Sequence, residues 1–283
     1  MLSRFEAYSQ RKTEAALAAP IPGFVTVTAP DDPAGFVSIG NDWSRRLFDG
    51  WFYRVADDAG RQCPALSLVF VESADGNTEA DDPSTLGGGA TDQHLVYEGL
   101  SRVDADAVLA GAAAAAGNEI VFSVWHPELV RLRLERGRTR HPAQVVITGR
   151  GDLPIETALL YNEPSLRVIV IATRAGAAAL APRVASRTWI DVIDAGAPLD
   201  VRFALGELQA RGIDVVSAIG GRRTAATLLQ AGVVSEIYLT TSPKMGGKPG
   251  TPLFDAGLPP HRVLLEKEGR AEERGVRFRH LVV

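Results

Sequence analysis

The chain has 283 residues, a formal net charge of −4 and an isoelectric point near 5.8. This length allows one large domain or a domain with an appendage, and we favour the second. The weakly acidic balance argues against nucleic acid as a partner, and the single cysteine, Cys63, excludes an intramolecular disulfide and any multi-cysteine zinc site.

The N-terminal segment carries charged residues before any apolar run, and no apolar stretch is long enough to span a membrane. We therefore expect a soluble cytoplasmic protein. The aromatic residues in 1–62 cluster without a clear period. We therefore predict that this segment is an extension that packs on the core or on a second subunit. A disordered tail is the alternative, but it would not normally keep so many aromatic residues. The cluster includes Trp43, Phe48, Trp51, Phe52 and Tyr53.

Residues 63–283 form the predicted main domain, in which strands alternate with helices. This order predicts parallel crossovers and a sheet covered on both faces, and three successive strands after Gly232 predict an antiparallel finish. The alanine run at 112–116 suggests the start of a helix. The alternating strands are predicted at 65–71, 107–110, 144–148, 167–173, 188–193 and 213–219, the final strands at 235–241, 262–267 and 276–283, and the helices at 92–103, 127–136, 174–180, 200–211 and 222–231.

The segment 213–254 carries the most specific pattern of the chain. An apolar run at 215–219 is broken by Gly220 and Gly221, and a stretch of helical composition begins at Arg222. Two residues without Cβ let the backbone approach a ligand closely, and the first helical N–H groups point outward. Such a corner suits a phosphate, and Arg222 and Arg223 add two cations beside it. We predict a dinucleotide as the ligand.

The pattern A-I-G-G-x-x-T-A-x-x-L-L-x-A-G-V-V-S-E-I-x-L-T-x-x-P in this segment, followed by Pro252-Leu253-Phe254, resembles the reductase domain at the C-terminus of bifunctional riboflavin-biosynthesis deaminase/reductases, the RibD C-terminal domain. That family shares its fold with dihydrofolate reductase. The resemblance covers roughly residues 64–283 and implies an α/β fold, with a mostly parallel sheet flanked by helices and antiparallel C-terminal strands. Four further motifs agree: Ser73-Ala74-Asp75-Gly76, Leu100-Ser101-Arg102, Gly111-Ala112 and Val145-Val146-Ile147-Thr148.

The deaminase of such bifunctional proteins needs His-x-Glu and Pro-Cys-x-x-Cys to hold a zinc-activated water. One cysteine cannot supply that site, so we expect a free-standing reductase. No two histidines have metal-ligand spacing with a carboxylate, and we assign no metal. The resemblance also implies a homodimer.

Gly220 and Gly221, with the helix start at 222–224, are implied to cradle the cofactor pyrophosphate; a tight turn without a ligand is the alternative. By the same resemblance we predict a cis peptide bond between the two glycines. Arg150, in the turn after the strand that ends at Thr148, is our candidate for the 2′-phosphate that distinguishes NADPH from NADH. A solvated arginine in a glycine turn is the alternative.

The predicted substrate residues follow from the resemblance. Asp75 and Gly76 form a turn dipeptide whose loop is also implied to line the cleft, and Asp75 is the least unsuitable candidate for a proton donor. Arg102 matches a family position that contacts the substrate phosphate; an ion pair on the helix surface is the alternative. The predicted cofactor-binding residues are Ser73, Gly111, Ala114, Thr148, Arg150, Gly220, Gly221, Arg222, Arg223 and Thr224, and the predicted substrate-binding residues are Asp75, Arg102 and Ile219.

Two positions depart from the family. Ala114 stands where a threonine is common, so one hydroxyl for the cofactor is missing, and Ile219 stands where a glutamate is implied to hold the substrate. Dihydrofolate reductases favour Ile-Gly-Gly at this place. We predict an NADPH-dependent reductase of a ribosylaminopyrimidine phosphate of the riboflavin pathway. The alternatives are an NADPH reductase of a pterin or another heterocycle, and a non-catalytic nucleotide-binding homodimer.

Overall fold

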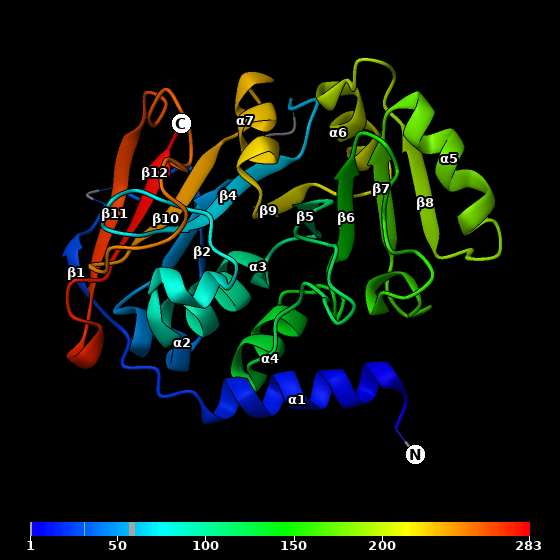
Figure 1. Cartoon of the computed structure of the whole chain (residues 1–283). Helices are drawn as coiled ribbons and strands as arrows, with labels where there is room; N and C mark the ends of the chain where they lie inside the picture. The colour runs from blue at the N-terminus through cyan, green and yellow to red at the C-terminus, as the bar shows by residue number, and fades with distance from the viewer. Residues whose placement is uncertain (1, 31, 57–59) are drawn as a thin grey trace.

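A ten-stranded sheet runs through the molecule in the order β1-β11-β12-β10-β4-β9-β5-β6-β7-β8 (Figure 1). The computed structural model describes residues 2–30, 32–56 and 60–283. All neighbours from β10 to β8 are parallel, and β12, β11 and β1 continue the sheet with antiparallel pairs. The parallel strands are β4 (Ala65–Glu72), β5 (Ala107–Gly111), β6 (Ala143–Thr148), β7 (Val168–Ala172), β8 (Ile190–Asp194), β9 (Val215–Ile219) and β10 (Glu236–Thr241), and the C-terminal antiparallel strands are β11 (Arg262–Gly269) and β12 (Arg277–Val282).

The central strands are apolar on both faces, which explains why they are visible in the sequence as continuous runs. Every residue of β5, β7 and β9 is buried. A strand buried on both sides belongs in a parallel sheet covered by helices on each face. The predicted α/β fold with antiparallel C-terminal strands is confirmed.

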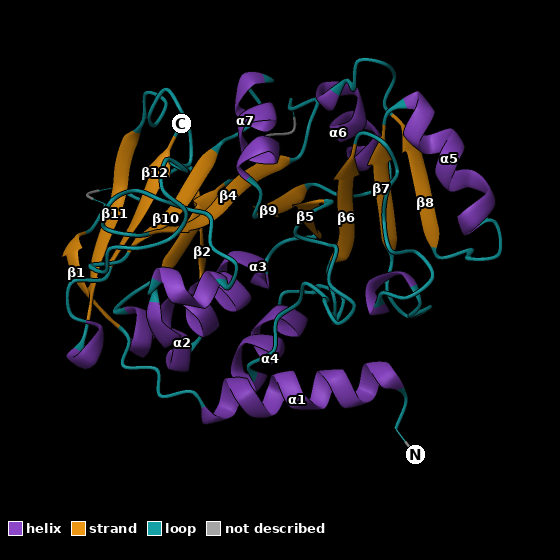
Figure 2. Cartoon of the chain, viewed as in Figure 1, coloured by secondary structure: helices purple, strands orange, loops and turns teal. Residues whose placement is uncertain are grey.

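Helices cover both faces of the sheet (Figure 2). One hydrophobic core contains side chains of the helices after β4 and β5 and of the N-terminal segment, and the other contains those of the two helices that flank β9. The first face carries η2 (Thr91–Leu100), α3 (Ser101–Val103), α4 (Pro127–Glu135) and α5 (Arg174–Val184), and the second carries α6 (Val201–Gln209) and α7 (Arg222–Gln230). No helix in the described residues is both long and apolar enough to cross a membrane.

The N-terminal segment packs on this core. It forms α1 (Arg4–Ala18), β1 (Phe24–Thr28), β2 (Phe36–Ile39), α2 (Asp42–Phe48) and β3 (Phe52–Val55). β1 pairs with β11 at the edge of the main sheet, and β2 pairs with β3 in a separate two-stranded sheet. The rings of Phe48 and Phe52 lie 5.4 Å apart, and Phe278 of β12 lies 5.4 Å from Phe48. The division between residues 62 and 63 stays a prediction.

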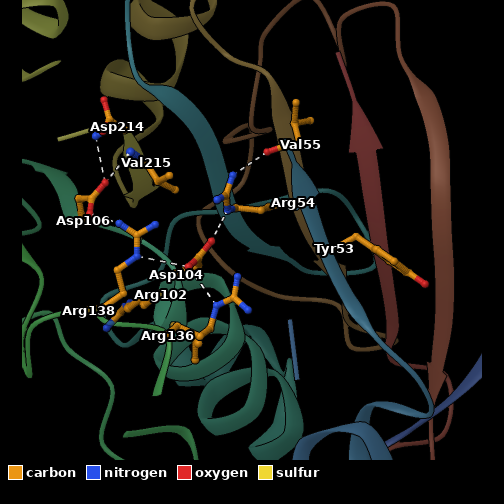
Figure 3. Close-up of polar contacts among 12 residues, drawn as sticks. Tyr53, Arg54, Val55, Arg102, Asp104, Asp106, Arg136, Arg138, Asp214 and Val215 are labelled. Carbon is orange, nitrogen blue, oxygen red and sulfur yellow. Dashed lines mark hydrogen bonds and ion pairs between the residues drawn. The ribbon is translucent and has the colours of Figure 1, made fainter. Parts of the chain in front are cut away.

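A polar network fastens β3 to the main domain (Figure 3). Arg54 of β3 binds the buried carboxylate of Asp104, which also accepts from Arg136 at 3.0 Å and Arg138 at 3.3 Å. The carboxylate of Asp106 binds Arg138 and accepts a hydrogen bond from the backbone N–H of Val215, with an N···O distance of 3.0 Å. Burial alone would raise the pKa of Asp104, but its arginine partners outweigh burial and lower it.

Residues 112–116 do not begin a helix, so this prediction is wrong. They form one turn, in which Ala115 N donates to Gly111 O at 3.2 Å and Ala116 N donates to Ala113 O at 3.4 Å. Gly117 follows, and the Cβ of Ala114 faces Gly220. The surrounding fold therefore overrides the helix propensity of alanine. The predicted helix at 92–103 is present as the π-helix η2 followed by α3, with a kink at Gly99.

Candidate functional site

The carboxyl ends of the central parallel strands bring most of the predicted cofactor residues to one edge of the sheet (Figure 1). Ala110 of β5 pairs with Ile219 of β9, and Gly111 pairs with Ile147 of β6. The segments that follow these strands therefore leave the sheet side by side. Open α/β sheets bind their ligands at this edge.

A glycine corner lies at this edge, formed by Gly111, Ala114, Gly220, Gly221 and Thr224. A Cβ placed on Gly111 would lie 2.5 Å from Thr224 Oγ1, and one on Gly220 would lie 3.4 Å from the Cβ of Ala114. Gly220 and Gly221 have φ values of 64° and 85°, a region that favours glycine. Gly221 is the N-cap of α7 and no side chain caps this helix, so its first N–H groups have no side-chain acceptor.

The predicted cis bond between Gly220 and Gly221 is wrong. Among the described residues the cis peptide bond is Ala197-Pro198, and the two glycines are joined by a trans bond. Their two positive φ values turn the chain from β9 into α7 without a cis bond.

The two arginines of α7 differ in their contacts. Arg222 Nε donates to Pro252 O, and its Nη2 binds the carboxylate of Asp255. Its guanidinium therefore fastens the loop after β10 to the start of α7. The side chain of Arg223 is exposed. Of these two arginines, Arg223 is therefore the more available to bind an anion at the glycine corner.

Thr148 and Arg150 lie after β6. Thr148 is 7% exposed and its Oγ1 accepts the Gly151 N–H at 3.2 Å. Arg150 is exposed, and its side chain makes no hydrogen bond or ion pair with any residue that the structure describes. A guanidinium without a partner beside a ligand-binding edge is available for an anion.

Asp75 organises the loop after β4. Its carboxylate accepts from Ser73 Oγ at 2.7 Å, from Asn77 Nδ2 at 2.8 Å and from Gly246 N at 3.1 Å. The hydrogen bond from Ser73, followed by that from Gly246, lowers the pKa of Asp75. The ionised form is thus favoured, and it holds this loop against the loop after β10.

Two predicted substrate residues lie in the interior. Arg102 is 1% exposed, its Nη1 donates to Ser123 O at 3.0 Å, and its guanidinium lies 4.4 Å from the centroid of the Tyr97 ring. It is therefore not on the helix surface, where the alternative had placed it. Ile219 is also 1% exposed and belongs to the first hydrophobic core.

Asp92 is a candidate functional residue that sequence reasoning missed. It is 8% exposed, and Thr240 Oγ1 of β10 donates to its carboxylate. Burial raises the pKa of Asp92 to about 6, the hydrogen bond from Thr240 opposes this, and the charge of Glu273 adds to it. Buried carboxylates with a raised pKa are concentrated at functional sites.

The sheet order places Thr240, the partner of Asp92, on β10, which is separated from β9 by β4. Thr240 pairs with Val71 of β4. Two residues earlier on the same strand, Val69 pairs with Ile219 of β9. In the sequence Asp92 is only a carboxylate at a helix start, and no local pattern reveals its burial.

The side chains that could bind a metal ion are not grouped in the described part of the chain, and the thiol of Cys63 is not activated. Within the described residues no group of three or more His, Cys, Asp or Glu side chains could hold a metal ion. Cys63 is partly buried, with its Sγ 3.7 Å from Arg202 O, and burial raises the pKa of its thiol. An unactivated thiol in this setting has a packing role.

Comparison with known proteins gives one family. The family described as the RibD C-terminal domain matches residues 64–273. No functionally curated protein matches the sequence.

Several solved structures share the fold. A pyrimidine reductase-like protein from Corynebacterium diphtheriae has a TM-score of 0.64 and 20% identity, covering 78% of this chain and 92% of that one. A diaminohydroxyphosphoribosylaminopyrimidine deaminase/5-amino-6-(5-phosphoribosylamino)uracil reductase from Thermotoga maritima has a TM-score of 0.55 and 21% identity, with 78% of this chain and 57% of that chain covered. The riboflavin biosynthesis reductase Rib7 of Saccharomyces cerevisiae has a TM-score of 0.52 and 14% identity, covering 80% of this chain and 93% of that one.

These likenesses are to the fold, because the identities are low. This chain spans a little over half the length of the bifunctional Thermotoga maritima protein, 57%.

Proposed function

This chain belongs to the RibD C-terminal domain family, and on that premise we propose that it is an NADPH-dependent reductase. Its proposed substrate is a ribosylaminopyrimidine phosphate of the riboflavin pathway, similar to 5-amino-6-(5-phosphoribosylamino)uracil. NADPH, when bound, supplies the hydride. We further propose a cytoplasmic homodimer, as the family resemblance implies.

The glycine corner is the observation that carries the proposal. The start of α7 offers N–H groups without a side-chain cap, and Gly220 and Gly221 add no side chain between the backbone and a ligand. A pyrophosphate at this place would meet the positive end of the helix dipole and the exposed Arg223. The residues present therefore fit a dinucleotide.

The other predicted residues have roles that follow from their positions. Arg150 would hold the 2′-phosphate, and Thr148 would fix the turn that presents it. Ser73 and Asp75 would order the loop over the cleft and help to exclude water. Arg102 and Ile219 would line the substrate site on the side that faces the protein interior.

The pair of Asp92 and Thr240 favours the second candidate, a reductase of a pterin or another heterocycle. A buried carboxylate can accept hydrogen bonds from adjacent N–H groups of a heterocycle. With a pKa raised to about 6, Asp92 can also hold a proton near neutral pH. Ile219, in place of the family glutamate, favours the same candidate.

The third candidate is a nucleotide-binding homodimer without turnover. Ala114 removes a hydroxyl from the cofactor side, and Ile219 removes a carboxylate from the substrate side. Loss of both groups would leave the fold intact, because Ala114 packs against the first hydrophobic core and Ile219 lies within it.

Two measurements separate the three candidates. A fluorescence titration with NADPH should saturate; no binding at millimolar NADPH would contradict both reductases. NADPH oxidation is then followed with a panel of ribosylaminopyrimidine phosphates and dihydropterins. Turnover with the phosphates supports the first candidate, turnover with the pterins the second, and binding without turnover the third.

A further inference from the structure

Two buried carboxylates lie against consecutive glycines that precede η2. Asp92 of η2 and Glu273 of the short helix η4 (Ala271–Glu273), which connects β11 to β12, are each 8% exposed. A Cβ on Gly88 would lie 2.7 Å from Asp92 Oδ2, and a Cβ on Gly89 would overlap Glu273 Oε1. Each glycine therefore gives room to one carboxylate, and the two acidic side chains meet neighbouring backbone positions although they are distant in the sequence.

Glu273 holds the start of the helix that carries Asp92. Its Oε1 accepts a hydrogen bond from the backbone N–H of Thr91 at 3.1 Å, and Ala90, the N-cap residue of η2, supplies no side-chain hydrogen bond. The first N–H groups of a helix have no partner within the helix, so an acceptor from another segment stabilises this end. The carboxylate of Glu273 is thus fixed at the residue next to Asp92, while Thr240 binds Asp92 from β10.

Capping of η2 alone does not explain why this residue is a glutamate. Glu273 Oε2 is buried and has no hydrogen-bond partner among the described residues. A glutamine could also accept the hydrogen bond from Thr91 and would place no charge in the interior. A carboxylate buried beside a second carboxylate costs free energy unless a cation or a proton compensates the charge.

No cation compensates these two carboxylates in the part of the chain that the structure describes. Neither Asp92 nor Glu273 forms an ion pair with a lysine, arginine or histidine there. Asp92 faces Glu273 of η4, Thr240 of β10, Tyr97 of η2 and the backbone of Gly88. Burial raises the pKa of Asp92, the hydrogen bond from Thr240 opposes this, and the negative charge of Glu273 adds to it.

We propose that Glu273 is a positioning residue that acts on Asp92 in two ways: its carboxylate holds the start of η2, and its charge extends to higher pH the range in which Asp92 keeps a proton. A proton on Asp92 compensates the pair, because one of the two buried carboxylates is then neutral. That this proton serves a bound heterocycle rests on the second candidate of the proposed function. The action of Glu273 on Asp92 does not depend on it.

The test compares Glu273→Gln with Glu272→Gln in the full chain, without NADPH or substrate. Both variants remove one negative charge from η4, but Glu272 is exposed and Glu273 is buried. The titration of the Asp92 carboxyl carbon is followed by NMR, with the signal assigned by its loss in Asp92→Asn. Its midpoint should fall by about one pH unit in Glu273→Gln, as expected when a like charge near a buried carboxylate is removed. In Glu272→Gln it should stay within about 0.2 pH unit of the wild type, because solvent and salt screen an exposed charge. Equal midpoints in Glu273→Gln and the wild type would overturn the role of the charge.

Glu273→Asp separates the two roles and tests the charge without removing it. The shorter side chain keeps the carboxylate but withdraws the acceptor from Thr91. Hydrogen exchange of the Thr91 amide should become about fivefold faster, the effect of losing a helix cap. The midpoint of Asp92 should stay within about 0.3 pH unit of the wild type.

Unchanged exchange of the Thr91 amide in Glu273→Asp would overturn the cap. A fall of the Asp92 midpoint as large as that expected for Glu273→Gln would show that the charge is not its cause. These measurements need neither cofactor nor turnover, so failure of NADPH to bind would contradict the proposed reductase and leave the two titrations unchanged.

Discussion

At the scale of single residues, Arg150 and Arg222 show how differently two arginines near the same edge can be placed. Arg222 is bound to Pro252 and Asp255, whereas Arg150 has no side-chain partner in the part of the chain that the structure describes. A ligand phosphate at Arg222 would have to displace existing contacts. At Arg150 it would gain charge-assisted hydrogen bonds without that loss.

Arg150→Ala should therefore weaken binding of NADPH about 10- to 100-fold, the range expected for loss of a charge-assisted phosphate contact. Binding of NADH should change little, since NADH lacks the 2′-phosphate. Fluorescence titrations with both cofactors check this. Arg131→Ala, which removes an exposed arginine of α4, is the control. An equal loss of affinity for NADPH and NADH would contradict the proposed role of Arg150.

Asp92 predicts a pH dependence of stability. Burial raises its pKa to about 6 in the folded protein, above the ordinary value for an aspartate. The folded state therefore binds this proton more tightly than the unfolded state. Asp92 stabilises the fold below about pH 4, and this contribution is lost as the pH rises through about 6.

Asp92→Asn keeps an acceptor for Thr240 and removes the titration. Relative to the wild type it should gain stability between about pH 4 and pH 7, by on the order of 3 kcal/mol for a shift of about two pKa units. Urea unfolding of both proteins across this range measures the difference. A difference that does not change with pH would show that Asp92 titrates normally.

At the scale of secondary-structure elements, the glycine corner depends on close contact between the end of β5 and the start of α7. The Cβ of an alanine at position 111 would lie 2.5 Å from Thr224 Oγ1 but 3.7 Å from Thr224 Cβ. The clash is thus with the hydroxyl alone.

Gly111→Ala should destabilise the protein by about 1–3 kcal/mol, the usual cost of overpacking. Adding Thr224→Ala removes the clashing oxygen and should recover most of the loss, a coupling expected of residues in contact. Denaturant unfolding of the wild type, both single variants and the double variant completes the cycle. Additive effects would mean that the two residues do not touch.

The sequence predicted these elements unevenly, for physical reasons. β9 and β7 are continuous apolar runs, so burial on both faces is visible in their composition. The turn at 112–116 was missed because alanine favours a helix locally, and the surrounding fold overrides this local preference. For Arg102 the sequence left a substrate contact and a helix-surface ion pair open, and its burial could not be predicted because it depends on distant segments of the chain.

The candidate site was predicted in the same uneven way. Gly220 and Gly221 mark the corner because a strand-to-helix turn needs their positive φ values, a requirement that is local in sequence. Asp92 was not found, since its raised pKa comes from burial and from Thr240 and Glu273, which lie far away in the sequence.

At the scale of the whole molecule, the N-terminal segment has two parts with different roles. β1 extends the main sheet by pairing with β11, and Phe48 and Phe52 pack on Phe278 of β12. Lys267 of β11 donates to Thr26 Oγ1 at 2.8 Å and to Asp49 O at 3.0 Å. By contrast, α1 lies on the surface and buries few side chains.

Deletion of residues 1–19 should therefore leave a folded protein, whereas deletion of residues 1–62 should not. The longer deletion exposes the edge of β11 and the aromatic side chains of the core, and it leaves Asp104 without Arg54. Thermal unfolding by circular dichroism and size-exclusion chromatography compare both with the full chain. We expect one cooperative transition for the shorter deletion and aggregation for the longer. If residues 63–283 alone melted like the full chain, the N-terminal segment would be an appendage, and β1 would contribute nothing essential to the sheet that it borders.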